Sequence, residues 1–200
     1  MAQLKDEIII LKSINYSESD KILSVFGRNT GKFSILAKGI RKLSSKNRGN
    51  LQTSSIVKIS YYRGSGMGVL TESDLICMPD FTIIDLKNVE RVLRLTNKVV
   101  QEDQQDVKSY DALKSVILRG FTQSDVDRYR IFLLSNNGFL PDWRICSKCN
   151  KNKPEYFDKE SFEVYCHECY NETNKSKLIA IANNAKRITK ILDNYIREYI

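Results

Sequence analysis

The chain has 200 residues, of which 42% are hydrophobic and 28% are charged. These values are ordinary for a globular protein and exclude a wholly disordered chain. The 32 Lys and Arg residues outnumber the 24 Asp and Glu residues, and the net charge of +8 favours an anionic partner. No apolar run approaches the roughly 20 residues that cross a bilayer, and two acids follow Lys5 where a signal peptide carries positive charge. We therefore expect a cytoplasmic protein that makes no membrane contact.

The positive charge is concentrated in one part of the chain. Between Lys21 and Thr71 there are ten Lys or Arg residues and no Asp or Glu. A surface that only keeps a protein soluble carries both positive and negative charges, whereas a long basic stretch without an acidic residue is typical of a phosphate-binding face. The alternative is a basic chain that has no anionic partner.

Residues 1–78 are predicted to form a β-rich domain. Five runs rich in Ile, Val, Phe and Tyr indicate strands, and they lie at 8–16, 22–27, 32–38, 56–62 and 68–77. The segment from Gly27 to Gly31 has the composition of a hairpin turn. The connection over 39–55 is polar and basic with almost nothing to bury, so we expect an exposed loop or a short polar helix. Five strands with one long connection after the third fit an OB-type barrel, and an SH3-like barrel is the main alternative.

After residue 78 the spacing of apolar residues changes to that of helices and predicts a helical domain over 79–144. Two helical faces run over 89–100 and 110–117, and Gly120 is interpreted as a left-handed cap. A third helix is expected to begin at Thr122, where Asp125 three residues on makes a weak capping box, and to end at 136–138. The fold class is therefore α+β, with a barrel followed by a helical bundle.

A last helix is predicted over about 175–199. Its apolar residues repeat with spacings of three and four, and they are Leu178, Ile181, Ala185, Ile188, Leu192, Tyr195 and Tyr199. This seam permits a coiled coil, but its Ala and Tyr residues favour packing on the chain's own helical domain, so we assign 173–200 to a C-terminal helix on that domain. The basic residues off the seam extend the basic surface, and they are Lys175, Lys177, Lys186, Arg187 and Lys190.

Four of the five cysteines form the pattern Cys146-x2-Cys149-x16-Cys166-x2-Cys169, which is typical of a metal site. Two residues between cysteines direct both thiolates at one ion, and the residues between the pairs predict a hairpin with strands at 155–157 and 162–165. Without a secretory signal, metal thiolate chemistry is favoured over disulfides. A tetrahedral set of four sulfurs suits one structural Zn²⁺, and we assign this zinc module to residues 145–172.

Four cysteines leave no open position for water on the ion, so the site is predicted to be structural rather than catalytic. A redox-sensitive thiol cluster is the alternative. Asn150 is expected in the left-handed conformation, His167 is expected to face solvent, and Cys77 is expected to be a small core residue. The sequence also lacks the common motifs of nucleotide-binding and metal-dependent enzymes. It has no GxxxxGK[ST] loop, no GxGxxG motif and no acidic cluster of the two-metal nuclease type. We therefore expect a binding protein rather than an enzyme.

Basic residues in and around the polar connection are the candidate nucleic-acid-binding residues. Charges at this density neutralise phosphates, so binding is expected to fall steeply with salt. Neighbours in a strand face opposite ways, which leaves one of Tyr61 and Tyr62 free to stack on a base, whereas Phe26 and Phe33 are expected to fill the barrel. The candidates are Lys32, Lys38, Arg41, Lys42, Lys46, Arg48, Tyr62 and Arg63.

The order of these parts resembles the RecO family of bacterial recombination mediators. The segment Tyr16 to Ile22 resembles the family's Tyr-x-Glu-x-Asp segment. Gly31-Lys32 followed by Ala37 to Lys42 is similar to its Gly-Lys and Ala-Lys-Gly-x-Arg-Arg signature. Gly49 to Gln52 is similar to its Gly-x-Leu-Gln, and Gly138 to Pro141 is similar to its Gly-x-x-Pro ahead of the metal module.

The resemblance implies a protein that binds single- and double-stranded DNA, anneals complementary strands and acts on strands coated with single-strand-binding protein. It also implies work with RecR in loading RecA, and a site in the helical domain for the C-terminal tail of single-strand-binding protein. Carried over by position, Lys38, Arg41 and Lys42 contact DNA. We expect a monomer in the bacterial cytoplasm, associated with the nucleoid. The main alternative is an RNA-binding OB/zinc-ribbon protein of translation or transcription; a zinc-dependent enzyme and a scaffold built on the last helix are two others.

Overall fold

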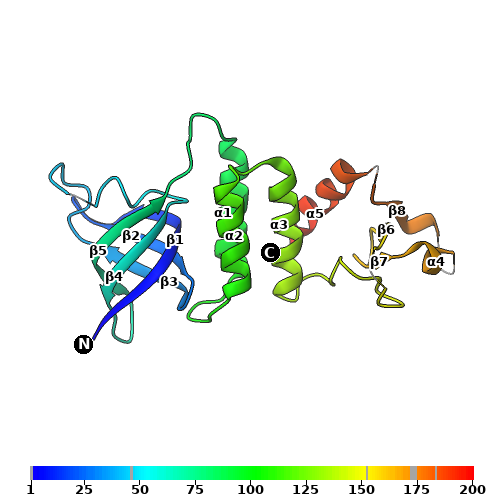
Figure 1. Ribbon diagram of the computed structural model, residues 1–200, viewed down its shortest axis with the longest axis horizontal. Coiled ribbons are helices and arrows are strands. Elements are labelled where there is room, and N and C mark those ends of the chain that lie inside the picture. Colours follow the sequence, from blue (N-terminus) through cyan, green and yellow to red (C-terminus); the bar gives the residue numbers. More distant parts are fainter. Residues whose placement is uncertain (1, 46, 152, 172–174, 183) are drawn as a thin grey trace. The chain divides into compact units, whose positions relative to one another are not determined.

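The computed structural model describes residues 2–45, 47–151, 153–171, 175–182 and 184–200 (Figure 1). The chain forms two compact units, Met1–Arg130 and Ile131–Ile200, and each is described by itself. Lys46, one of the candidate nucleic-acid-binding residues, lies outside the described residues. In the described part of the chain, every helix is too short or too polar to cross a membrane.

The first unit begins with a closed five-stranded barrel of the OB type. Its strands are β1 (Gln3–Asn15), β2 (Lys21–Gly27), β3 (Gly31–Ala37), β4 (Ile56–Tyr62) and β5 (Gly68–Cys77). The strand order is β1-β2-β3-β5-β4, and β4 closes the barrel on β1. The β3–β5 pair is parallel and the other pairs are antiparallel. The α+β class and the OB-type barrel expected from the sequence are confirmed, with the first strand beginning five residues early.

Alternate residues of the strands face the barrel interior, as the two-residue period requires. Tyr61 is fully buried and stacks on Phe33 with 5.2 Å between ring centroids, whereas its neighbour Tyr62 is 40% exposed. Phe33 therefore fills the barrel as expected. The core residues are Ile8, Ile10, Leu23, Val25, Phe33, Ile35, Ala37, Ile40, Leu51, Val57, Ile59 and Tyr61.

Phe26 is buried but lies on the outer side of the barrel. Its position in β2 alternates with Leu23 and Val25, which face the core, and its ring packs edge-on against Tyr110 with 5.5 Å between centroids. The prediction that Phe26 fills the barrel is therefore wrong. The residue belongs to the contact between the barrel and the helices that follow.

The long connection between β3 and β4 is a series of turns anchored in the barrel core. Lys42, Ser45 and Arg48 each donate a backbone N–H to the carbonyl three residues earlier. Ile40 is 3% exposed and Leu51 is 1% exposed, and both belong to the core cluster. The expectation that this connection buries almost nothing is wrong, because two apolar side chains close one part of the barrel. We name residues 38–52 the basic loop.

Three helices follow the barrel: α1 (Leu86–Val99), α2 (Val107–Leu118) and α3 (Gln123–Asn136). Gly120 has a φ of +74° and ends the second helix, as expected. One half of the predicted capping box is present, because Thr122 Oγ1 accepts the Asp125 N–H at 3.3 Å. The Asp125 carboxylate accepts the Thr122 hydroxyl at 2.6 Å, where a full capping box has a bond from the Thr122 backbone N–H.

Glu7 of β1 joins the barrel to α2. Its carboxylate accepts hydrogen bonds from the Tyr110 hydroxyl at 3.0 Å and from Lys114 Nζ at 2.7 Å. Burial raises the pKa of Glu7, but Lys114 and Tyr110 together outweigh this effect and leave the pKa lowered. A second tie is the ion pair between Arg28 and Asp111, with a contact of 3.0 Å.

The second unit carries a small sheet and the last helix. Strands β6 (Tyr156–Asp158), β7 (Val164–Tyr165) and β8 (Leu178–Ala180) pair in the order β7-β6-β8. The short helix α4 (His167–Tyr170) follows β7, and a 3-10 turn (Lys175–Lys177) precedes β8. The antiparallel β6–β7 pair is the hairpin predicted between the cysteine pairs.

The last helix, α5 (Ala185–Tyr199), begins ten residues later than predicted. Leu178 to Ala180 pair with β6 instead, and the Ile181 N–H donates to the Glu155 carbonyl at 2.8 Å. The side chain of Ile179 is buried at this edge of the sheet. The strand conformation thus forms backbone hydrogen bonds with β6 and also buries an apolar side chain. Within α5, Ile188 and Leu192 are buried, and the Tyr195 hydroxyl donates to the Phe139 carbonyl at 2.9 Å.

Leu51→Ala is expected to lower the free energy of unfolding by about 2 to 4 kcal/mol, because it removes a fully buried core side chain and leaves a cavity. Leu43→Ala is the matched control, since Leu43 lies in the same loop but is 91% exposed. Urea unfolding followed by circular dichroism measures both variants. Equal stability of the two variants would contradict the anchoring of the basic loop by Leu51.

Candidate functional site

The N-terminal end of the basic loop is held by the loop between β1 and β2. Asp20 Oδ1 accepts the Gly39 N–H at 2.7 Å, and this bond is the main cause of the lowered pKa of Asp20. Arg41 donates its backbone N–H to the Ser19 carbonyl and its side chain to the Ser17 carbonyl, both at 2.9 Å. Gly39 adopts a φ of +63°, a conformation that favours glycine. The two loops are therefore fixed against each other.

The C-terminal end of the basic loop is bonded to β5. Asn47 Oδ1 accepts the Ser73 hydroxyl at 2.9 Å, and Asn50 Nδ2 donates to the Ser73 carbonyl at 3.1 Å. Gln52 Nε2 turns back within the loop and donates to the Arg48 carbonyl at 2.8 Å. A segment that is mostly polar is thus held in a defined conformation at both ends.

The structure places four predicted nucleic-acid-binding residues together on this loop. Lys38, Arg41, Lys42 and Arg48 are all exposed. Lys38 lies near enough to Asp20 to help lower the pKa of that carboxyl group. Among the described residues, Lys42 and the Arg48 guanidinium have no ion-pair partner, so these charges are available to an external anion.

A cavity of about 400 Å³ lies between the basic loop and the facing ends of β1 and β2. Its lining residues are Asn15, Lys21, Ile40, Arg41, Arg48, Leu51 and Gln52. Lys21 was not among the predicted site residues. The only signal for it in the sequence is its place as the first residue of the stretch that contains no acid.

Lys32 and Arg63 already have protein partners. Lys32 Nζ donates to the Asn97 carbonyl at 2.8 Å. The Arg63 guanidinium makes two bonds to the Asp103 carboxylate, one of them at 2.9 Å, and lies over the Phe33 ring at 5.1 Å from its centroid. These bonds, above all, raise the pKa of Arg63. A role for these two cations in nucleic-acid binding stays a prediction, as does base stacking on the exposed ring of Tyr62.

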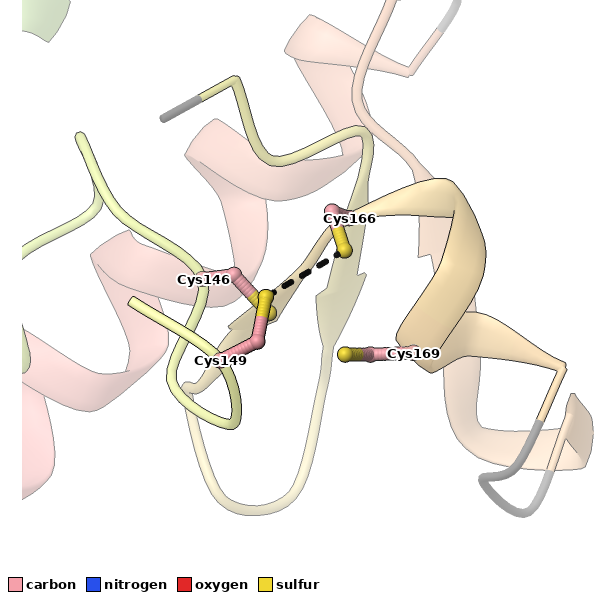
Figure 2. Close-up of side chains that lie close together, drawn as sticks. All are labelled: Cys146, Cys149, Cys166 and Cys169. Carbon is pink, nitrogen blue, oxygen red and sulfur yellow. Dashed lines mark hydrogen bonds between the residues drawn. The ribbon is translucent and has the colours of Figure 1, made fainter. Parts of the chain in front are cut away.

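The four cysteines of the second unit converge on one point (Figure 2). Their sulfur atoms all lie within 4.8 Å of one another, and the Sγ atoms of Cys149 and Cys166 are 3.7 Å apart. A tetrahedral ion with metal–sulfur bonds of about 2.3 Å places its sulfurs about 3.8 Å apart. The spacing therefore fits a four-coordinate metal ion.

Turns in the backbone bring each cysteine pair into this geometry. Asn150 has a φ of +58°, the left-handed conformation expected for it, and its N–H donates to the Cys146 carbonyl at 2.9 Å. The second pair is set by α4, because Cys166 precedes this helix and Cys169 lies within it. His167 is exposed, as predicted, with Nδ1 3.6 Å from the Glu155 carboxylate.

The thiols shift one another's ionisation because they are so close together. Burial opposes ionisation of Cys146, but backbone N–H groups of Cys149, Cys166 and Lys148 outweigh it and lower its pKa to about 6. Burial and the neighbouring thiols raise the pKa of Cys169 to about 12. Four thiolates at these distances need a cation to offset their repulsion, so the donor set fits a thiophilic divalent ion. Cys77 stands apart from this cluster and is half-buried, not a full core residue as expected.

Comparison with known proteins assigns the chain to a family. The model of "Recombination protein O N terminal" matches residues 1–78, and that of "Recombination protein O C terminal" matches residues 89–184. The chain belongs to the RecO family. The family identified from the sequence is thereby confirmed.

Curated relatives named DNA repair protein RecO match most of the chain. The protein from Mesoplasma florum is 26% identical over 88% of this chain and 70% of its own length. The protein from Oceanobacillus iheyensis is 27% identical over 80% of this chain and 66% of its own length. That from Acetivibrio thermocellus is 28% identical over 96% of this chain and 80% of its own length. The chain is therefore a member of a DNA repair protein family.

The structure joins the two segments in which the sequence resembles RecO motifs. Asp20 belongs to the Tyr-x-Glu-x-Asp segment and Gly39 to the Ala-Lys-Gly segment, and the hydrogen bond between them joins the two. The first segment supplies the acceptor, and the second supplies the donor and the glycine conformation. In this chain, both segments thus position the N-terminal end of the basic loop.

Asp20→Ala is expected to release the N-terminal end of the basic loop, because the Gly39 N–H loses its acceptor. Amide hydrogen exchange measured by mass spectrometry should quicken by at least about tenfold over residues 38–42 and remain unchanged in β4. Glu18→Ala is the control, since Glu18 is exposed and has no hydrogen-bond or ion-pair partner among the described residues. Unchanged exchange in the Asp20 variant would contradict the role of this bond and show that the other contacts suffice to hold the N-terminal end of the loop.

The pH dependence of this bond follows from the lowered pKa of Asp20. The carboxylate stays charged above the ordinary carboxyl pKa, so the bond is fully present there. It is lost as the pH falls through the lowered value of the folded protein.

Proposed function

We propose that this RecO-family chain is a recombination mediator that binds single- and double-stranded DNA and anneals complementary strands without ATP. The observation that carries this proposal is the basic loop: four exposed cations and no acid, held at both ends on an OB-type barrel. OB-type barrels bind nucleic acid chiefly through a positively charged groove and stacking platforms.

Annealing needs weak and exchangeable contacts to two polyanions, which diffuse positive charge supplies. Lys38, Arg41, Lys42 and Arg48 are assigned to phosphate contacts, and the exposed ring of Tyr62 is assigned to stacking on a base. Lys46 belongs to the same stretch of the sequence. Phosphate contacts carry no sequence information, so binding is expected to tolerate any sequence.

The proposed partners follow from the RecO family. The chain acts in the bacterial cytoplasm as a monomer, works with RecR in loading RecA, and takes the C-terminal tail of single-strand-binding protein. In this division of roles, residues 1–78 bind DNA and residues 79–144 form the helical domain. Residues 145–172 form the zinc module, and 173–200 include the last helix on the helical domain.

We also propose that Cys146, Cys149, Cys166 and Cys169 hold one Zn²⁺ ion. The sulfur spacing fits tetrahedral coordination, and Zn²⁺ prefers such a set. When bound, the ion cross-links the two cysteine pairs and offsets the charge of their thiolates. All four positions are taken by sulfur, so the assigned role is structural and the protein acts by binding rather than by catalysis.

The proposed function is tested by annealing of two complementary fluorescent oligonucleotides, first bare and then coated with single-strand-binding protein. The protein is expected to accelerate annealing in both conditions without ATP. Acceleration of bare strands only would show the nonspecific effect that any polycation has on annealing, and would contradict action on coated strands. No acceleration in either condition, with the fold intact, would contradict the proposal.

Charge reversal tests the basic loop directly. The variant Lys38→Glu, Arg41→Glu, Lys42→Glu is expected to lower duplex DNA affinity at least about tenfold, and to reduce the slope of log affinity against log salt by about 2 to 3, since about 0.9 is lost per phosphate contact. The matched control is Lys5→Glu, Lys12→Glu, Lys58→Glu, whose exposed side chains lie on strands of the same barrel. Equal losses in both variants would show that only net charge matters.

Cys149→Ser is expected to lower the zinc content from about one ion per chain to near zero, as measured by atomic emission, because the tetrahedral set loses a ligand. The variant should also show a lower melting temperature, since metal binding contributes to folding. Cys77→Ser is the control, because Cys77 lies outside the cysteine cluster. Full zinc content in the Cys149 variant would contradict the assigned site.

A further inference from the structure

The cavity beside the basic loop is lined by cations from two separate parts of the chain. Lys21 begins β2, whereas Arg41 and Arg48 belong to the basic loop. Asn15 and Gln52 add amide groups to the lining. No acidic residue lies among the lining residues, so the cavity has the chemistry of an anion site.

Two of these cations have their charge available. Among the described residues, neither the Lys21 ammonium nor the Arg48 guanidinium has a hydrogen-bond or ion-pair partner. Arg41 differs, because one of its guanidinium nitrogens is bonded to the Ser17 carbonyl and fixes the side chain. The cavity thus combines one cation already positioned by the protein with two that can turn towards a ligand.

The floor of the cavity is fixed by the barrel core. Ile40 and Leu51 line the cavity and are also buried members of the core cluster. The hydrogen bond from the Gly39 N–H to the Asp20 carboxylate and the bond from Gln52 Nε2 to the Arg48 carbonyl hold the loop around it. The backbone around the cavity is therefore fixed by the fold, while the side chains of Lys21 and Arg48 keep the freedom to turn.

The lining carries the donors that suit a phosphate group. A guanidinium binds two phosphate oxygens at once, and an ammonium binds as a compact point charge. A volume of about 400 Å³ holds a phosphate group together with part of its nucleotide.

We propose that this cavity receives one phosphodiester of single-stranded DNA, and that Lys21 and Arg48 make the protein favour single strands over duplexes. A single strand bends freely and can turn one phosphate inward. Duplex DNA is stiff over about 150 base pairs, and its phosphates lie on a convex ridge that does not enter a concave pocket. Lys38 and Lys42 are exposed and lie outside the cavity lining, so they contact both forms. This inference rests on the proposed DNA-binding function.

The test compares two double variants of equal charge. Lys21→Gln with Arg48→Gln removes the free cavity cations, and Lys38→Gln with Lys42→Gln removes cations outside the cavity. Fluorescence anisotropy measures the affinity of each for a 5′-labelled oligo-dT strand of about 20 nucleotides and for a duplex of about 20 base pairs, at one salt concentration. Melting temperatures of both variants establish that they are folded.

The cavity variant is expected to lose about tenfold in affinity for the single strand and less than about twofold for the duplex. Its slope of log affinity against log salt should fall by about 0.7 for the single strand, the value for one phosphate. The variant outside the cavity should weaken binding to both forms by similar factors. Equal losses for single strand and duplex in the cavity variant would overturn the inference, and so would an unchanged affinity for the single strand.

Inorganic phosphate distinguishes a DNA site from a site for free phosphate. With ionic strength held constant by chloride, millimolar phosphate is expected to displace the single strand no better than chloride does, because neighbouring contacts keep the strand in place. Saturable displacement that disappears in the cavity variant would assign the cavity to free phosphate instead. A wild-type protein that binds neither form of DNA would defeat the proposed function as well, whereas normal binding with unchanged strand preference would defeat this inference alone.

Discussion

The burial of Ile40 and Leu51 in the barrel core is the interaction on which the arrangement of the basic loop depends. The basic loop is rich in mutually repelling cations, and ordering its backbone costs conformational entropy. Burial of two aliphatic side chains in the barrel core offsets part of this cost. The bonds of Asp20, Asn47 and Asn50 add further ties. Only with these anchors do the loop cations share one arrangement.

The second constraint is the distribution of acids in the first unit. The stretch from Lys21 to Thr71 has no acid of its own, but residues from elsewhere in the unit neutralise part of it in space. Asp111 pairs with Arg28, and Asp103 pairs with Arg63. Among the described residues, the carboxylate that contacts the basic loop near its N-terminal end is that of Asp20, which accepts the Gly39 N–H. Folding therefore concentrates the free positive charge on the loop more sharply than the sequence does.

Local patterns predicted the features that depend on local chemistry. The two-residue period predicted the strands, Gly120 and Thr122 predicted the ends of two helices, and the cysteine spacing predicted the cysteine cluster. The errors arose where contacts between residues far apart in the sequence determine the local structure. Leu178 and Ile181 have helical spacing with the residues after them, yet residues 178–180 form strand β8 and pair with the edge of β6. Phe26 is apolar and buried, but only the position of Tyr110 shows which side of the barrel it faces.

The second unit reaches its structure by a different kind of interaction. Its sheet has three short strands with few buried apolar residues, and small units of this kind commonly need a metal ion or disulfides for stability. Six basic and six acidic residues balance over 145–184, and several are paired, including Lys151 with Glu168 and Lys177 with Glu160. A neutral surface offers no electrostatic attraction to phosphates. The stretch that carries ten basic residues and no acid thus lies in the first unit, while in the second unit the four cysteine sulfurs come together beside a sheet with few buried apolar residues.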